Sequence, residues 1–267
     1  MIPRPGPVAG SVDFSRDSMV HGGDETAILR AVATRTLRNE TMEEFARKHG
    51  QLREDLLTQG DRVVAHAMRA VESFFQNDAE AAHAVIEGDL VIDKADIDIE
   101  RASIQLLMYS PREEYDIRSV FTIVKINNEL ERIADCGVNI AEASQAHGDD
   151  RPKSGTFEVM ANSVIGMVRD ANRAMRERDQ ELARRVLDFD DTIDRFRGEV
   201  VRLVQTAVKD GTMPLDDALE LLNVNRALER MADHCTNICE QLIYLESGKI
   251  VRHLPTGWTE PTPPEQD

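Results

Sequence analysis

The chain has 267 residues, with 32 lysines and arginines against 49 aspartates and glutamates, which gives a formal net charge of −17. Phosphate groups repel so acidic a protein, so we expect no nucleic-acid partner and no adsorption to an anionic membrane. Aromatic residues make up only 4% and hydrophobic residues 41% of the sequence, so aliphatic side chains must build the core, which favours helices over sheets.

Flexible-looking segments frame two long helical regions. Residues 1–24 are rich in Gly, Pro and Ser without periodicity and predict a disordered N-terminal extension, and the proline-rich residues 253–267 predict a disordered tail. The segment 147–155 is the most linker-like stretch between them. No apolar run approaches the roughly 18 residues of a membrane span, and no signal-peptide pattern begins the chain. We therefore expect a cytoplasmic protein without membrane insertion.

Each helical region, 25–146 and 156–252, is expected to hold three long helices. Helix starts are indicated at Asn77–Asp78 and Asp179, where an aspartate precedes an amphipathic run. Ser110-Pro111-Arg112-Glu113 has the capping-box pattern of a third start. A further break is indicated between Asp210 and Pro214.

The two regions repeat each other. NNELERIADCGVNIAE at 127–142 aligns with NRALERMADHCTNICE at 225–240, and GDLVID at 88–93 aligns with FDDTID at 189–194. Each half carries these segments in the same order. The sequence thus predicts an all-α protein of six long helices, arranged as two tandem, pseudo-symmetric three-helix bundles.

Acidic side chains recur at helical spacing in the repeated segments. Beside the apolar row of each third helix runs a polar row at i, i+4 and i+8, and each second helix adds a pair of aspartates. Carboxylates spaced in this way repel one another unless a cation offsets the charge, and an oxygen-rich set suits Mg²⁺, Ca²⁺, Mn²⁺ or iron better than structural zinc. The predicted metal ligands are Asp89, Asp93, Glu131, Asp135, Asn139, Asp190, Asp194, Glu229, Asp233 and Asn237.

Two simpler interpretations compete with metal binding. The rows could be solvated acidic faces, or arginines could neutralise them, although Arg132 and Arg230 lie about 100° round the helix from the neighbouring glutamates. No motif of a catalytic site is present, so we expect no enzyme. His49, His66 and His83 are interpreted as surface or boundary residues, and the three cysteines, Cys136, Cys235 and Cys239, as buried small apolar side chains.

The duplicated LERIAD…NIAE and LERMADH…NICE segments, with LIYLESGKIVRH at 242–253, resemble the PhoU family of phosphate-transport accessory proteins across residues 41–253. The Asp-Ile-Arg at 116–118 is similar to a family Asp-Leu-Arg, whereas Cys136 stands where the family usually has His. The resemblance implies metal clusters at the (E/D)xxxD pairs, with ions of the iron, Mn, Mg or Zn class. It also implies a phosphate ABC transporter ATPase and a sensor histidine kinase as partners, with negative regulation of phosphate uptake and starvation signalling, and it is compatible with a homodimer.

Two alternatives stay open at this point. The same fold could serve as a helical adaptor for another transporter, with the acidic rows solvated. A carboxylate-rich metal-storage or oxidase bundle is the other alternative, although an oxidase would want a paired Glu-x-x-His set that the repeats do not supply.

Overall fold

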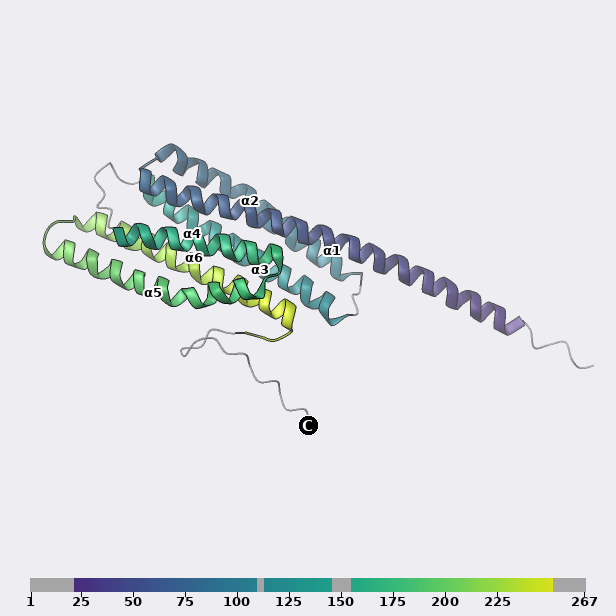
Figure 1. The fold of residues 1–267 in the computed structure, drawn as a ribbon. Helices are drawn as coiled ribbons and strands as arrows, with labels where there is room; N and C mark the ends of the chain where they lie inside the picture. Colours follow the sequence, from purple (N-terminus) through teal and green to yellow (C-terminus); the bar gives the residue numbers. More distant parts are fainter. Residues whose placement is uncertain (1–21, 110–112, 146–154, 252–267) are drawn as a thin grey trace, which may run out of the picture. The chain divides into compact units, whose positions relative to one another are not determined.

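The computed structural model describes residues 22–109, 113–145 and 155–251. Across these ranges it forms six α-helices and no strand (Figure 1). The helices are α1 (Gly22–Gln76), α2 (Ala79–Leu107), α3 (Glu114–Gln145), α4 (Gly155–Glu177), α5 (Gln180–Lys209) and α6 (Leu215–Ser247). The predicted all-α class with six long helices is confirmed.

Local signals position most helix boundaries as expected. Asp78 and Asp179 cap α2 and α5, each accepting a hydrogen bond from the backbone N–H three residues later. Pro214 precedes α6, and Gly248 ends it in the left-handed conformation, with a φ of 72°. α1 begins at Gly22, slightly inside the segment expected to be disordered. The rest of the predicted extension and tail, most of the linker and Ser110–Arg112 lie outside the described residues.

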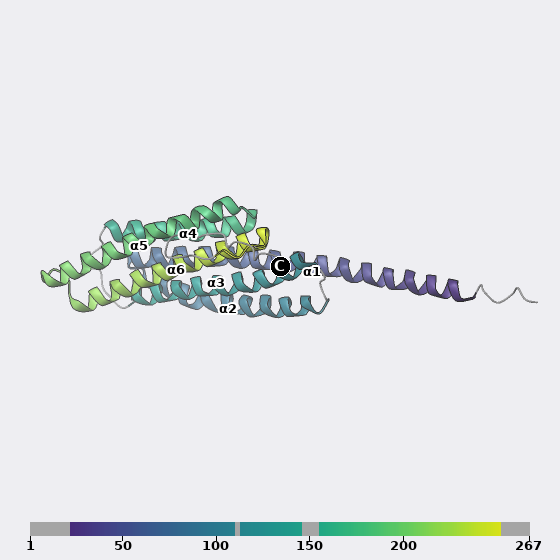
Figure 2. The same cartoon turned by 90° about the horizontal axis from the view of Figure 1, so that it is seen from below.

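The chain divides into two compact units, residues 1–44 and 45–267. The described part of the first unit is the beginning of α1. The second unit contains both repeats, residues 45–76 of α1 with α2 and α3, and α4 with α5 and α6. Within this unit α2 packs against α3, α5 packs against α6, and α3 and α6 join the repeats (Figure 2).

Apolar stripes on the two joining helices explain this packing. The stripe of α3 buries Ile126, Leu130, Ile133 and Ile140, and that of α6 buries its counterparts Val224, Leu228, Met231 and Ile238. Removing these aliphatic side chains from water provides the main driving force for association of the helices. Cys136, Cys235 and Cys239 are also buried and unpaired, as predicted, and burial raises the pKa of the Cys136 thiol to about 11.

Candidate acidic metal sites

The carboxylates predicted in the first repeat face one another between α2 and α3. Burial raises the pKa of Asp89 to about 6, and the negative charges of Asp93 and Asp135 add to the rise. Burial also raises the pKa of Glu131, with contributions from Asp135, Asp96 and Asp93. Such mutual effects require the charged groups to lie close together. We name this set cluster 1: Asp89, Asp93, Asp96, Glu131 and Asp135.

The second repeat brings together its own four predicted carboxylates, which we name cluster 2: Asp190, Asp194, Glu229 and Asp233. Burial raises the pKa of Asp233, and Asp190 and Asp194 add to this effect. Burial likewise raises the pKa of Glu229, but here the guanidinium of Arg197 acts in the opposite direction. The Arg197 Nε lies 2.9 Å from Glu229 Oε2.

Asp96 and Arg197 occupy equivalent places in the two repeats. Asn127 Nδ2 donates a hydrogen bond of 3.0 Å to the backbone carbonyl of Asp96, and its counterpart Asn225 donates one of 3.4 Å to the carbonyl of Arg197. Asn127 Nδ2 also lies 2.6 Å from Asp96 Oδ1. Sequence reasoning missed both residues, because it searched for what the repeats share. Neutralisation by arginine, left open above, therefore occurs in cluster 2 through Arg197 of α5.

His66 of α1 extends cluster 1. Its side chain is only 6% exposed, and its Nε2 lies 3.9 Å from Asp89 Oδ1. Neither atom has a hydrogen-bond partner although both are buried. The ring fits because position 137 is glycine: a Cβ there would lie 2.8 Å from His66 Cδ2. The interpretation of His66 as a surface or boundary residue was wrong, since α3 covers it.

The caps Asp78 and Asp179 are equivalent, and His66 and Met167 precede them by the same number of residues. The buried Met167 is therefore the counterpart of His66 in the second repeat. The place of Gly137 is taken by the buried Cys235. Neither of these two side chains carries a basic nitrogen. Burial lowers the pKa of His66 and so favours the neutral imidazole. A hydrogen bond to the backbone of Ala134 opposes this effect but does not outweigh it.

The donors of cluster 1 fit a divalent cation. Asp89 and His66 each leave a buried, unpartnered atom on the same side of the cluster, and carboxylate oxygens with a neutral imidazole are ordinary ligands of Mn²⁺, Fe²⁺ and Zn²⁺. As the side chains stand, no three His, Cys, Asp or Glu residues in the described ranges form a group that could hold an ion. The mutual repulsion of carboxylates opposes a closer approach until a cation offsets it.

The two predicted asparagine ligands are engaged elsewhere. Asn139 Nδ2 donates to the backbone carbonyl of Asp135, one turn earlier on α3. Asn237 Nδ2 donates to Glu129 Oε2 at 3.0 Å, across the interface between the repeats. A ligand role for Asn139 and Asn237 stays a prediction.

Glu129 links the repeats from the middle of α3. Its Oε2 accepts a second hydrogen bond, of 2.7 Å, from His234 Nδ1. Burial tends to raise the pKa of Glu129, but the hydrogen bonds from His234 and Asn237 outweigh it, and the pKa falls below its usual value. We name these three residues the Glu129 clamp. Nearer the start of α3, Arg118 of the Asp-Ile-Arg segment donates to the Leu245 carbonyl and lies over Tyr115 and Tyr244.

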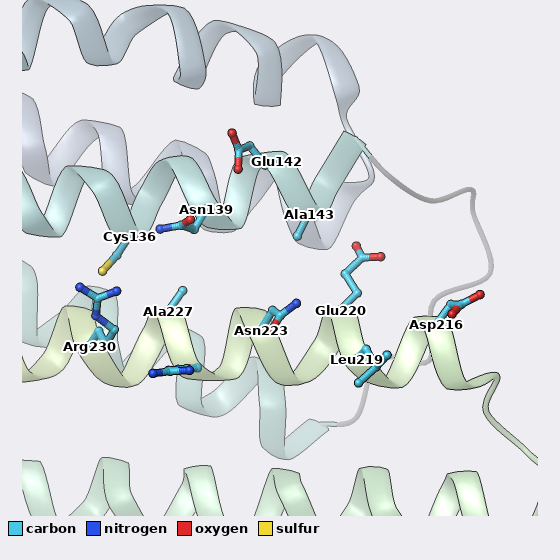
Figure 3. Close-up of a pocket in the computed structure, with 11 residues that line it drawn as sticks. Cys136, Asn139, Glu142, Ala143, Asp216, Leu219, Glu220, Asn223, Ala227 and Arg230 are labelled. Carbon is cyan, nitrogen blue, oxygen red and sulfur yellow. The ribbon is translucent and has the colours of Figure 1, made fainter.

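The place equivalent to the Glu129 clamp, where later residues of α3 meet earlier residues of α6, borders an open pocket of about 700 Å³. The counterparts of Glu129, His234 and Asn237 are Ala227, Cys136 and Asn139, and all three line it (Figure 3). Arg230 lies near Cys136, with Glu220 and Asp216 further along α6 (Figure 3). The pocket therefore exists where two members of the Glu129 clamp have been replaced by smaller side chains.

Comparison with known proteins settles the family. The PhoU domain model matches residues 56–144 and 157–242, one match for each repeat. The chain belongs to the PhoU family. Proteins of this family are regulatory accessory proteins, in agreement with the expectation that this chain is not an enzyme.

Individual relatives support the assignment over most of their length. PhoU homolog 1 of Thermotoga maritima, a phosphate-specific transport system accessory protein, is 34% identical over 195 residues, which cover 70% of this chain and 82% of the relative. PhoU of Escherichia coli is 28% identical over 208 residues, 76% of this chain and 85% of the relative.

Two crystal structures share the fold. PhoU of Streptococcus pneumoniae superposes with a TM-score of 0.73 at 26% identity, over 78% of this chain and 99% of the other. PhoU of Pseudomonas aeruginosa gives the same TM-score at 27% identity, over 76% and 99%. Within the described part of the chain, no helix is both long and apolar enough to span a membrane.

Proposed function

We propose that this protein is a regulatory accessory protein of a phosphate transport system, which restrains phosphate uptake and phosphate-starvation signalling. The observation that carries the proposal is the family match over both repeats, together with relatives that are named as phosphate-specific transport accessory proteins. The ATPase subunit of a phosphate ABC transporter and a sensor histidine kinase are the proposed partners. Both would meet the protein in the cytoplasm.

Metal binding is the proposed link between the acidic clusters and docking. Burial and the neighbouring carboxylates raise the pKa values of Asp89 in cluster 1 and Asp233 in cluster 2, so ionisation of these two groups is unfavourable without a cation. A bound cation would reduce the negative charge of the helix face, which would ease the approach of an acidic or neutral partner surface. The proposed ions are divalent and of the iron, manganese, magnesium or zinc class.

A co-purification experiment tests the partners and the metal step together. The chain is expressed in a phosphate-replete host that lacks its own copy, as wild type or as Asp135→Ala/Asp233→Ala, and proteins bound to it are identified. We expect wild type to retain the transporter ATPase and the kinase, and the double variant to lose both. The control Asp98→Ala/Asp191→Ala removes two exposed carboxylates outside the clusters and should behave as wild type.

Each alternative function gives a different result. Retention of the components of another transporter would favour the helical adaptor. Unchanged partner binding by Asp135→Ala/Asp233→Ala would contradict the metal step while leaving the regulatory function. Iron that turns over with oxygen would favour a storage or oxidase bundle. Homodimerisation stays a prediction, which light scattering of the purified chain can check.

A further inference from the structure

We propose that the two acidic clusters have different cation requirements: cluster 1 binds divalent cations with His66 as a nitrogen ligand, whereas in cluster 2 the guanidinium of Arg197 takes the place of a cation. The inference rests on the metal-binding part of the proposed function and adds which repeat is loaded and which class of metal it selects. It is carried by differences between two sites that share one backbone arrangement.

The first difference is one of charge. The two clusters match carboxylate for carboxylate, except that Asp96 of cluster 1 is replaced by Arg197 in cluster 2. Arg197 lies 2.9 Å from Glu229 Oε2 and so already supplies a positive charge to one of the oxygens of this cluster. A guanidinium stays charged at every accessible pH, so this neutralisation is permanent. A divalent cation entering cluster 2 would have to displace it and would also be repelled by it.

The second difference is the nitrogen donor. His66 is buried beside Asp89, with its Nε2 unpartnered and 3.9 Å from the carboxylate oxygen. Only a glycine at position 137 leaves room for the ring, since a Cβ there would lie 2.8 Å from it. The second repeat has Met167 and Cys235 at these places. Imidazole is a good ligand for Mn²⁺, Fe²⁺ and Zn²⁺ and a poor one for Mg²⁺ and Ca²⁺.

A pair of matched variants tests which cluster binds. The full chain is freed of metal with a chelator and titrated with Mn²⁺, and the free ion is followed by its electron paramagnetic resonance signal. We expect wild type to bind Mn²⁺, Asp89→Asn/Asp135→Asn to lose the tight binding, and Asp190→Asn/Asp233→Asn to keep the wild-type stoichiometry. Equal losses in the two double variants would overturn the inference alone. Absence of Mn²⁺ binding by wild type would overturn both the inference and the metal step of the proposed function.

The role of Arg197 is tested by restoring the charge of the first repeat. Arg197→Asp should gain a second class of bound Mn²⁺, one that Asp190→Asn/Asp233→Asn removes again. Arg195→Asp provides the control, because it makes the same charge change on the same helix at an exposed residue whose guanidinium donates to the hydroxyl of Thr192. An equal gain in both variants would attribute the effect to net charge and contradict the role of Arg197.

The role of His66 is tested by metal selectivity. His66→Met installs the residue of the second repeat, and His66→Gln keeps a polar side chain. We expect the affinity of both variants for Mn²⁺ to fall at least about tenfold, the size of loss usual when a metal site is perturbed. The affinity for Mg²⁺ should change much less. Loss of the two affinities in equal proportion, or loss of neither in variants with wild-type circular dichroism, would show that His66 is not a ligand.

Discussion

Asn127 in the first repeat and Asn225 in the second donate to equivalent backbone carbonyls. The carbonyl belongs to Asp96 in the first repeat and to Arg197 in the second. Side-chain charge has thus reversed where the main-chain geometry has not. The pairs His66–Gly137 and Met167–Cys235 show the same pattern in the core. A duplicated framework can therefore keep its helices and let each copy acquire its own electrostatics.

The interface between the repeats has diverged as well. α3 and α6 run antiparallel, so the equivalent of the Glu129 clamp lies closer to the end of α3 and the start of α6, where Ala227 and Cys136 line a pocket. Charged hydrogen bonds close one of these two equivalent places, and the other is open. The variants described next remove or create one such difference each.

The largest effect is expected on removing the clamp. Glu129→Ala leaves His234 and Asn237 partly buried without their acceptor, which should lower the free energy of unfolding by about 2 kcal/mol. Urea unfolding followed by circular dichroism measures the change. Glu142→Ala, an exposed glutamate at the pocket end of α3, is the control and should stay within about 0.5 kcal/mol of wild type. A similar loss in both variants would contradict the clamp's stabilising role.

Exchanging the buried pair should have the next largest effect. Gly137→Cys places a Cβ 2.8 Å from His66 Cδ2 and should cost about 1–2 kcal/mol of unfolding free energy through overpacking. Combining it with His66→Met reproduces the pair of the second repeat and should recover at least half of that cost. A double-mutant cycle from urea unfolding gives the coupling. Strict additivity of the two changes would mean that His66 and Gly137 do not compete for space.

Building a second clamp should stabilise the protein. Cys136→His with Ala227→Glu places the missing acceptor and donor in the pocket beside Asn139, and the new charged hydrogen bonds should add about 1 kcal/mol to the unfolding free energy. Each single variant should lack this gain, because it introduces a polar group without its partner. Thermal unfolding of the four proteins of the cycle reports the difference. A double variant no more stable than the better single one would argue against equivalence of the two places.

The smallest effect is a pH dependence in cluster 1. Folding raises the pKa of Asp89 from 3.8 to about 6, so the folded chain holds a proton that the unfolded chain has released. The contribution of Asp89 is therefore most favourable near pH 4 and is lost as the pH rises to about 6. In chelator-treated protein, Asp89→Asn should be about 0.5–1 kcal/mol more stable than wild type at pH 7, after allowance for solvent screening, with no difference near pH 4.

The matched change Asp190→Asn sharpens this last prediction. Arg197 already supplies positive charge to cluster 2, so the gain at pH 7 should be smaller there. Urea unfolding at several pH values gives both comparisons. A larger gain from Asp190→Asn than from Asp89→Asn would contradict the assignment of the less compensated charge to the first repeat.

The fold and the acidic rows were predictable because they are both periodic and repeated. The apolar stripe around Ile133 recurs around Met231, and the pair Glu131–Asp135 recurs as Glu229–Asp233, so each copy reinforces the signal of the other. Residues that face each other across α2 and α3 could be expected to meet because every such pair had an equivalent. Duplication therefore provided the strongest signal for shared features.

The residues that distinguish the clusters could not be found in this way. His66 has Met167 as its counterpart, Asp96 has Arg197 and Glu129 has Ala227, so a search for repeated chemistry passes over all three. Their contacts also join helices distant in sequence: Glu129 and His234 are 105 positions apart. Only the packed arrangement of α1, α2 and α3 shows that a histidine on the first helix reaches an aspartate on the second.

The uneven fastening of α3 to α6 has a consequence for local opening of the chain. Arg118 holds the last turn of α6 and the Glu129 clamp holds its middle, whereas the first turns of α6 border the pocket and expose Leu215 and Leu219 to water. Amide hydrogens exchange with solvent fastest where few buried contacts must break. Exchange in α6 should therefore begin at Leu215 and progress toward Cys235, so that the helix frays from its pocket end while its last turn stays closed.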